Sequence, residues 1–173
     1  MAAIRFDTQT SPCDRALPNL QVPMINTMVR CLEAEHRKMD ERILQLALAA
    51  TRLASAPNEL TARARAVEAW DEIRRELWSH LQIEDELVFS WANSHRALTP
   101  AMLEALKSDR EQMRNLLASL PQLEASDAVG PESNLDGAGF AQSLIALAQN
   151  LDSHIEHYDT EVLPAVLRAV FSK

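Results

Sequence analysis

The sequence contains few of the residues that build sheets, tight turns or disulfide frameworks. Only three of the 173 residues are glycine, two are cysteine, and aromatic residues make up 5%. No stretch alternates apolar and polar residues over the length of a strand, so we do not expect a sheet. Alanine, leucine, glutamate and arginine are abundant, and these residues favour helices. The composition therefore predicts an all-α protein.

Further absences narrow the classes of function. The chain carries 17 Lys and Arg against 25 Asp and Glu, a formal net charge of −8, whereas general nucleic-acid binding needs a cationic surface. No apolar run approaches the roughly 18 residues of a membrane span, and Met1 to Leu20 lacks the apolar core of a signal peptide. We therefore expect a cytoplasmic protein with neither nucleic acid nor membrane as a partner. Cys13 and Cys31 lack metal-type spacing and are interpreted as reduced thiols.

The chain divides into an arm and one helical domain. Residues 1–20 show no periodicity and are interpreted as an N-terminal arm, and residues 21–173 form the domain. Apolar residues recur there at three- and four-residue intervals in four segments, which predicts four helices. These run from Pro23 to about 54–57, from 58–60 to about 93, from Pro100 to about 121, and from 136–140 to about 170. We expect an up-down-up-down four-helix bundle.

Two local signals refine the helix boundaries. Thr99-Pro100 is a helix start, with Thr99 as N-cap and Pro100 at the first helical position. Pro164 is expected to kink the last helix or to end its regular hydrogen bonding. The longest connection, residues 124–139, holds all three glycines and is interpreted as a connector, with a partner surface as the alternative.

The strongest pattern is an internal repeat of 74 residues. The segment His80-Leu81-Gln82-Ile83-Glu84-Asp85 corresponds, 74 residues later, to His154-Ile155-Glu156-His157-Tyr158-Asp159. The same shift carries Glu35-His36 onto Asp109-Arg110. The chain therefore looks like one helical hairpin written twice, with potential metal ligands on three of the four helices and Arg110 at the fourth place.

The potential ligands fall on the apolar faces of their helices. His80 and His154 each lie three residues after a leucine, and His36 lies four after one. Glu84 follows His80 by four residues and shares its face. Asp159 follows His154 by five residues, about 140° round the helix, so it reaches the interior only from the edge, with a surface charge as the alternative.

Three histidines and a carboxylate in one interior favour a metal site over separate core residues. A single histidine on an apolar stripe is usually a satisfied core residue, but here three come from separate helices at repeat-equivalent heights. Burying a carboxylate is costly unless it is paired or holds a cation. Imidazole and carboxylate suit iron, manganese or zinc, and helix bundles build such sites from inward-facing side chains.

These residues resemble the hemerythrin-like, or HHE cation-binding, family. The matching motifs are Glu35-His36, His80-x-x-x-Glu84-Asp85 followed by Val88-Phe89, and His154 with Asp159 followed by Val162-Leu163-Pro164. The resemblance covers residues 24–171 and implies a four-helix bundle around a non-haem di-iron centre. It implies that iron is held by His36, His80, Glu84, His154 and Asp159, with Glu84 and Asp159 as bridging carboxylates.

Two positions depart from the pattern of that family. Arg110 stands where the third helix should supply a histidine, and Tyr158 stands at the place equivalent to Glu84. A guanidinium cannot ligate a metal, but beside carboxylates it could replace one iron electrostatically; alternatively it extends out of the bundle. Tyr158 is interpreted as a space-filling hydrogen-bond donor, with ligation as the alternative. If the register slips, Glu111 or Gln112 could supply an oxygen ligand.

Three functions stay open at this point. The first is a mono- or di-iron protein that binds or senses dioxygen, nitric oxide or a related small molecule. The second is a metal-free scaffold or regulatory protein in which Arg110 neutralises Glu84 and Asp159. The third is a redox enzyme that consumes, for example, peroxide, with Tyr158 as the acid. The sequence favours the first, and without a nucleophile triad or cofactor fingerprint an enzyme is not the expectation. A protein partner or a homo-oligomer stays open.

Overall fold

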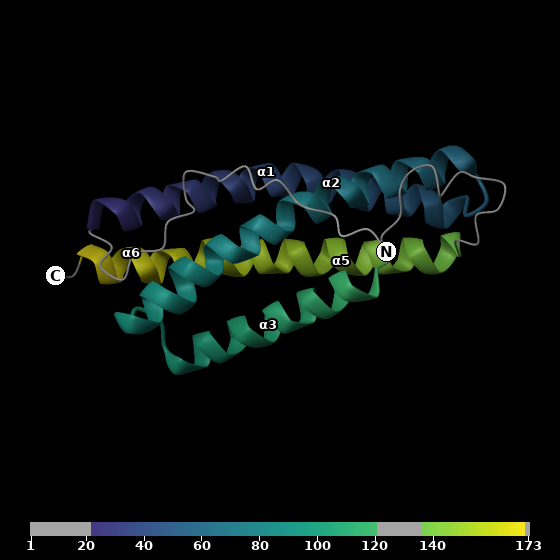
Figure 1. The fold of residues 1–173 in the computed structure, drawn as a ribbon. Helices are drawn as coiled ribbons and strands as arrows, with labels where there is room; N and C mark the ends of the chain where they lie inside the picture. The colour runs from purple at the N-terminus through teal and green to yellow at the C-terminus, as the bar shows by residue number, and fades with distance from the viewer. Residues whose placement is uncertain (1–21, 121–135, 172–173) are drawn as a thin grey trace, which may run out of the picture.

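The computed structural model describes residues 22–120 and 136–171 (Figure 1). The elements in chain order are α1 (Val22–Ser55), α2 (Leu60–Glu84), η1 (Asp85–Ala92), α3 (Pro100–Ser119), α5 (Gly137–His157), η2 (Tyr158–Val162) and α6 (Leu163–Phe171), where η1 and η2 are π-helices. The described ranges contain no strand, so the all-α prediction is confirmed. The predicted arm, Cys13 and most of the long connection lie outside the described residues.

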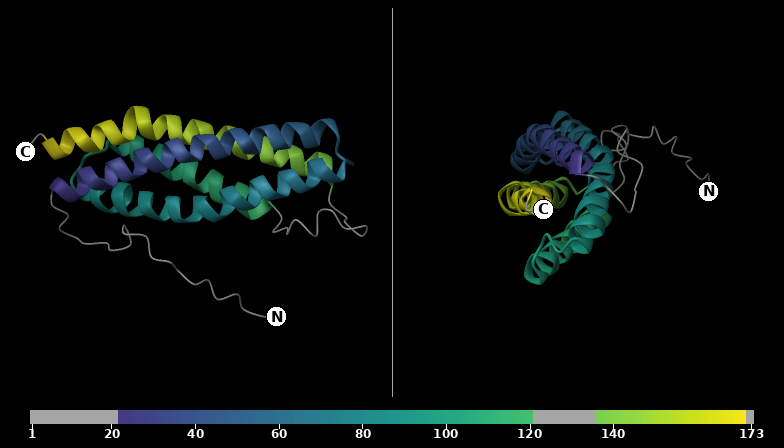
Figure 2. Two further views of the ribbon diagram at one scale, coloured as in Figure 1. Left: turned by 90° about the horizontal axis from the view of Figure 1, so that it is seen from above. Right: turned by 90° about the vertical axis from the view of Figure 1, so that its left-hand side faces the viewer.

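The elements form four rods of alternating direction. α2 continues into η1, and α5 continues through η2 into α6. The α5–α6 rod runs beside α1 along the length of the molecule, while α2 starts beside α1 and then diverges toward η1 (Figures 1 and 2). α3 lies against α5 at an angle. The up-down-up-down four-helix bundle is therefore confirmed.

Local signals place the helix boundaries as predicted. The Thr99 hydroxyl accepts a hydrogen bond from the backbone N–H of Met102 at 3.2 Å, with Pro100 at the first helical position. The regular α pattern gives way to η2 at Tyr158 and resumes at Leu163, so that Pro164 lies in the first turn of α6. However, η1 follows Glu84 at the repeat-equivalent place and contains no proline. The π-helices therefore accompany the repeat and do not depend on a proline.

The interior consists of two apolar clusters with a polar layer between them. The first cluster lies toward the α1–α2 turn and includes Leu46, Trp70, Leu77, Leu144 and Leu151. The second lies toward the opposite end and includes Ile25, Leu32, Leu87, Leu106 and Val166. Where one cluster gives way to the other along the rods lie the buried polar or charged residues: His36, His80, Glu84, Arg110 and His154. The buried polar and charged side chains therefore lie together at one level along the bundle axis.

The described helices also bear on the membrane expectation. None of those in residues 22–120 and 136–171 is long and apolar enough to cross a membrane.

The two apolar clusters should carry most of the stability, and two neighbouring leucines of α1 test this. Leu46 is fully buried and Leu44 is 57% exposed. Leu46→Ala should lower the free energy of unfolding by about 2–5 kcal/mol, because it leaves a cavity, whereas Leu44→Ala should change it by less than about 0.5 kcal/mol. Urea unfolding of both variants measures the difference. Equal losses would contradict the placement of the core.

Candidate metal centre

The polar layer draws side chains from all four rods. His36 comes from α1, His80 and Glu84 from α2, and His154 from α5, and each is at most 3% exposed. Their predicted interior positions are confirmed. Arg110 of α3 joins them and is 5% exposed, so the alternative in which its guanidinium extends to solvent is wrong.

Glu84 lies at the centre of this layer. Its Oε1 is 3.0 Å from Nε2 of His80, 3.0 Å from Nε2 of His154 and 3.7 Å from Nε2 of His36. The carboxylate has no exposed surface. Imidazoles from three rods therefore converge on one buried carboxylate.

Three of these side chains are grouped closely enough to share an ion. One ligand atom each from His36, His80 and Glu84 lies within 4.8 Å of the others, and no other such group occurs in the described residues. His36 Nε2, His80 Nε2 and Glu84 Oε2 are buried and have no hydrogen-bond partner within the described part of the chain. A buried polar atom without a partner costs about 1–3 kcal/mol. A metal ion would satisfy all three atoms, so this donor set fits one.

An outer carboxylate holds the other nitrogen of each histidine. His80 Nδ1 lies 3.2 Å from Glu35 Oε2, and His154 Nδ1 lies 2.6 Å from Asp109 Oδ2. His36 Nδ1 lies 2.6 Å from Asp159 Oδ1. Such a carboxylate fixes the tautomer and ring orientation of a metal-binding histidine and makes it more basic. The arrangement aims all three Nε2 atoms inward.

Asp159 therefore differs in position from the other predicted ligands. Its side chain is 42% exposed and contacts the outer nitrogen of His36, at the edge of the layer where its spacing from His154 places it. In this arrangement Asp159 orients a histidine, and a role as a direct or bridging ligand stays a prediction. Glu111 and Gln112 are exposed on α3, so the alternative that depends on a shifted register is wrong.

The contacts repeat with the same 74-residue shift as the sequence. Glu35–His80 and Asp109–His154 are repeat-equivalent pairs, each 45 residues apart. The pair His36–Asp159 has its equivalent in Arg110–Asp85, with Arg110 Nη2 2.8 Å from Asp85 Oδ2. Arg110 Nη2 also donates to the backbone carbonyl of Leu81.

The outer carboxylates Glu35, Asp85 and Asp109 were missed as site residues. The signal was available, since Glu35 and Asp109 are related by the repeat, as are Asp85 and Asp159. Spacing alone does not show which neighbouring rod such a side chain reaches.

Tyr158 fills the place equivalent to Glu84 in the second half of the repeat. It is 1% exposed, and its ring centroid lies 4.6 Å from that of His154 and 5.9 Å from that of His36. Burial, together with the nearby charge of Glu84, raises the pKa of the phenol above its ordinary value. Tyr158 is therefore neutral and packed between two histidines, which agrees with the space-filling interpretation.

The histidines and Glu84 also stabilise each other's charges when no metal is bound. Burial lowers the pKa of His80, but the carboxylates of Glu35 and Glu84 outweigh burial and raise it to about 9. Burial likewise lowers the pKa of His154, and Glu84 and Asp109 raise it to about 9. Burial raises the pKa of Glu84, yet the surrounding histidines bring it well below its usual value. In the metal-free protein both histidines are therefore cationic at neutral pH.

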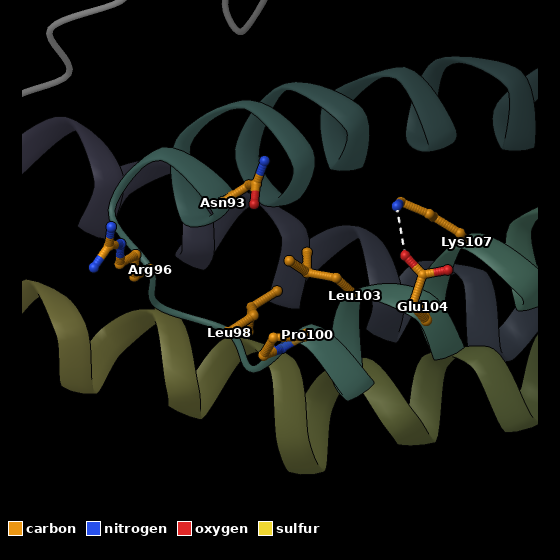
Figure 3. A pocket seen from close by; sticks show the side chains of 7 residues that line it. All are labelled: Asn93, Arg96, Leu98, Pro100, Leu103, Glu104 and Lys107. Carbon is orange, nitrogen blue, oxygen red and sulfur yellow. Dashed lines mark hydrogen bonds and ion pairs between the residues drawn. The ribbon is translucent and has the colours of Figure 1, made fainter.

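A separate hollow of about 390 Å³ lies at the turn between η1 and α3 (Figure 3). Its lining includes Arg96, Leu103 and Lys107, and the Lys107 ammonium is paired with Glu104 at 2.7 Å. None of the side chains of the polar layer lines it. We therefore assign it no part in the metal centre.

The raised pKa values predict how the stability of the metal-free protein depends on pH. A histidine whose folded pKa exceeds its unfolded value of 6.5 contributes stability that is complete below pH 6.5 and lost as pH rises through the folded pKa of about 9. With a chelator present, the free energy of unfolding should fall from pH 6.5 to 9.5. His80→Gln should make the slope shallower. A flat profile for the parent protein would contradict the charge network.

Comparison with known proteins bears on the identity of this bundle. The family model described as hemerythrin HHE cation binding domain matches residues 27–166. No curated protein and no solved structure matches the chain. The matched span contains every residue of the polar layer and both halves of the repeat. The chain belongs to the hemerythrin HHE cation-binding domain family.

Proposed function

We propose that this protein binds non-haem iron and uses it to bind or sense dioxygen or a related small molecule such as nitric oxide. The observation that carries the proposal is the buried group of His36, His80 and Glu84, whose inward-facing atoms lack hydrogen-bond partners in the described part of the chain. The chain also belongs to a cation-binding family. A cytoplasmic location and a further protein partner stay predictions.

The donor set supports iron among the common metals. Two imidazole nitrogens and a carboxylate oxygen suit divalent transition metals, and the set of two histidines with one carboxylate is typical of iron(II) sites with open positions. When bound, iron supplies open coordination positions and redox chemistry for a diatomic ligand.

The residues of the chain prepare the place for such an ion. Glu35 and Asp159 orient the imidazoles of His80 and His36 from outside. Apolar clusters on both sides of the layer keep bulk water from the centre. A dry, preoriented site limits side reactions and controls the redox potential of a bound metal.

The partners of the two carboxylates weigh against a metal-free scaffold in which Arg110 neutralises them. Glu84 and Asp159 contact histidines, and Arg110 pairs with Asp85 and donates to the Leu81 carbonyl. The peroxide-consuming alternative depends on Tyr158 as the acid. The pKa of this phenol is raised, which makes it a weaker acid, and its ring packs between two histidines. Both observations weigh against this alternative.

Metal analysis tests the proposal directly. The protein, loaded with ferrous iron under anaerobic conditions and then desalted, should retain iron in proportion to chain. Its optical spectrum should change on addition of dioxygen or nitric oxide. Glu84→Gln should abolish both results, because it removes the anionic centre of the layer, whereas Glu104→Gln on the surface should change neither. A parent protein that retains no iron would overturn the proposal.

A further inference from the structure

The two halves of the repeat contribute different side chains to the polar layer. The first half contributes His36, His80 and Glu84, whose ligand atoms form one compact group. The equivalent positions of the second half are Arg110, His154 and Tyr158. Arg110 cannot ligate a metal at all, and Tyr158 could ligate iron only after losing its phenolic proton, so His154 is the one ready ligand of these three.

Both ring nitrogens of His154 are already engaged. Nδ1 lies 2.6 Å from Asp109 Oδ2, and Nε2 lies 3.0 Å from Glu84 Oε1 with hydrogen-bond geometry. His80, the repeat-equivalent residue, also lies 3.0 Å from Glu84 Oε1 through its Nε2. It differs from His154 because its ligand atom belongs to the compact group with His36 and Glu84, which does not include His154.

Arg110 occupies the remaining part of the layer. Arg110 is 5% exposed, and its guanidinium is held by Asp85 at 2.8 Å and by the Leu81 carbonyl, one turn before Glu84. A fixed cation in this place contributes positive charge without coordination. It also repels a second metal ion, because two like charges at short range in a buried layer are costly.

We infer that the centre takes a single metal ion, held by His36, His80 and Glu84, and that Arg110 takes the electrostatic place of a second ion. His154 then acts as a hydrogen-bond donor that positions Glu84. This inference rests on the proposed function, because it presupposes that metal binds. It extends that proposal by assigning the number of ions and by separating ligands from positioning residues.

Counting metal per chain is the primary test. After anaerobic ferrous loading and desalting, elemental analysis of the parent protein should give one iron per chain, with no bands of an iron pair in the optical spectrum. Two irons per chain would overturn the inference and leave the proposed function standing. No iron would overturn the proposed function, and the inference with it.

The repeat offers a matched pair of variants, His80→Gln and His154→Gln. His80→Gln should lose most of its iron, because it removes a ligand. His154→Gln should still bind one iron per chain, with affinity weakened by at most about 10–100-fold, as expected for an outer partner. Circular dichroism checks that both remain helical. Equal loss of iron from two folded variants would show that His154 is a ligand and would overturn the assignment.

A third variant tests whether Arg110 is the obstacle to a second ion. Arg110→His combined with Tyr158→Glu gives the second half of the repeat the same three residue types as the first. The double variant should rise from one iron to two per chain. A folded double variant that still binds one iron would overturn the assigned role of Arg110.

Discussion

A carboxylate without exposed surface lies in the middle of this bundle, and the rest of the polar layer follows from the cost of burying it. An isolated ionised carboxylate in an apolar interior is unstable unless it gains partners or neutralises. Here Glu84 gains imidazoles from three rods. Those histidines are in turn held by carboxylates at the edge of the layer, where solvent reduces the cost of the added negative charge.

This chain of contacts explains why the metal-free bundle can persist and why it is suited to metal. Cationic His80 and His154 form buried ion pairs with Glu84, and such pairs require good geometry to offset their desolvation. A divalent ion at the same place supplies the same positive charge as two protonated histidines. Metal and protons therefore compete for the same nitrogens, as they do wherever histidines are ligands.

The repeat makes the two halves of the polar layer symmetric, and two positions at which the halves differ break that symmetry. Equivalent pairs of residues make equivalent contacts in both halves, down to the outer aspartates, which are 42% and 43% exposed. Arg110 and Tyr158 break the symmetry, because one is a fixed cation and the other a neutral ring. The half with histidine and glutamate at these places has the donors for metal.

The amino-acid sequence by itself determined the helical class, the four rods, the Thr99 cap and the interior position of His36, His80, Glu84 and His154. These features depend on local periodicity and on a repeat visible in one dimension. Only the tertiary structure decided which carboxylate meets which histidine, that Asp159 reaches His36 from outside, and that Arg110 stays buried against Asp85. Each of these contacts joins different rods, and the relative rotation and tilt of two rods is set by side-chain packing across the whole bundle. A pattern along one helix carries no information about that rotation.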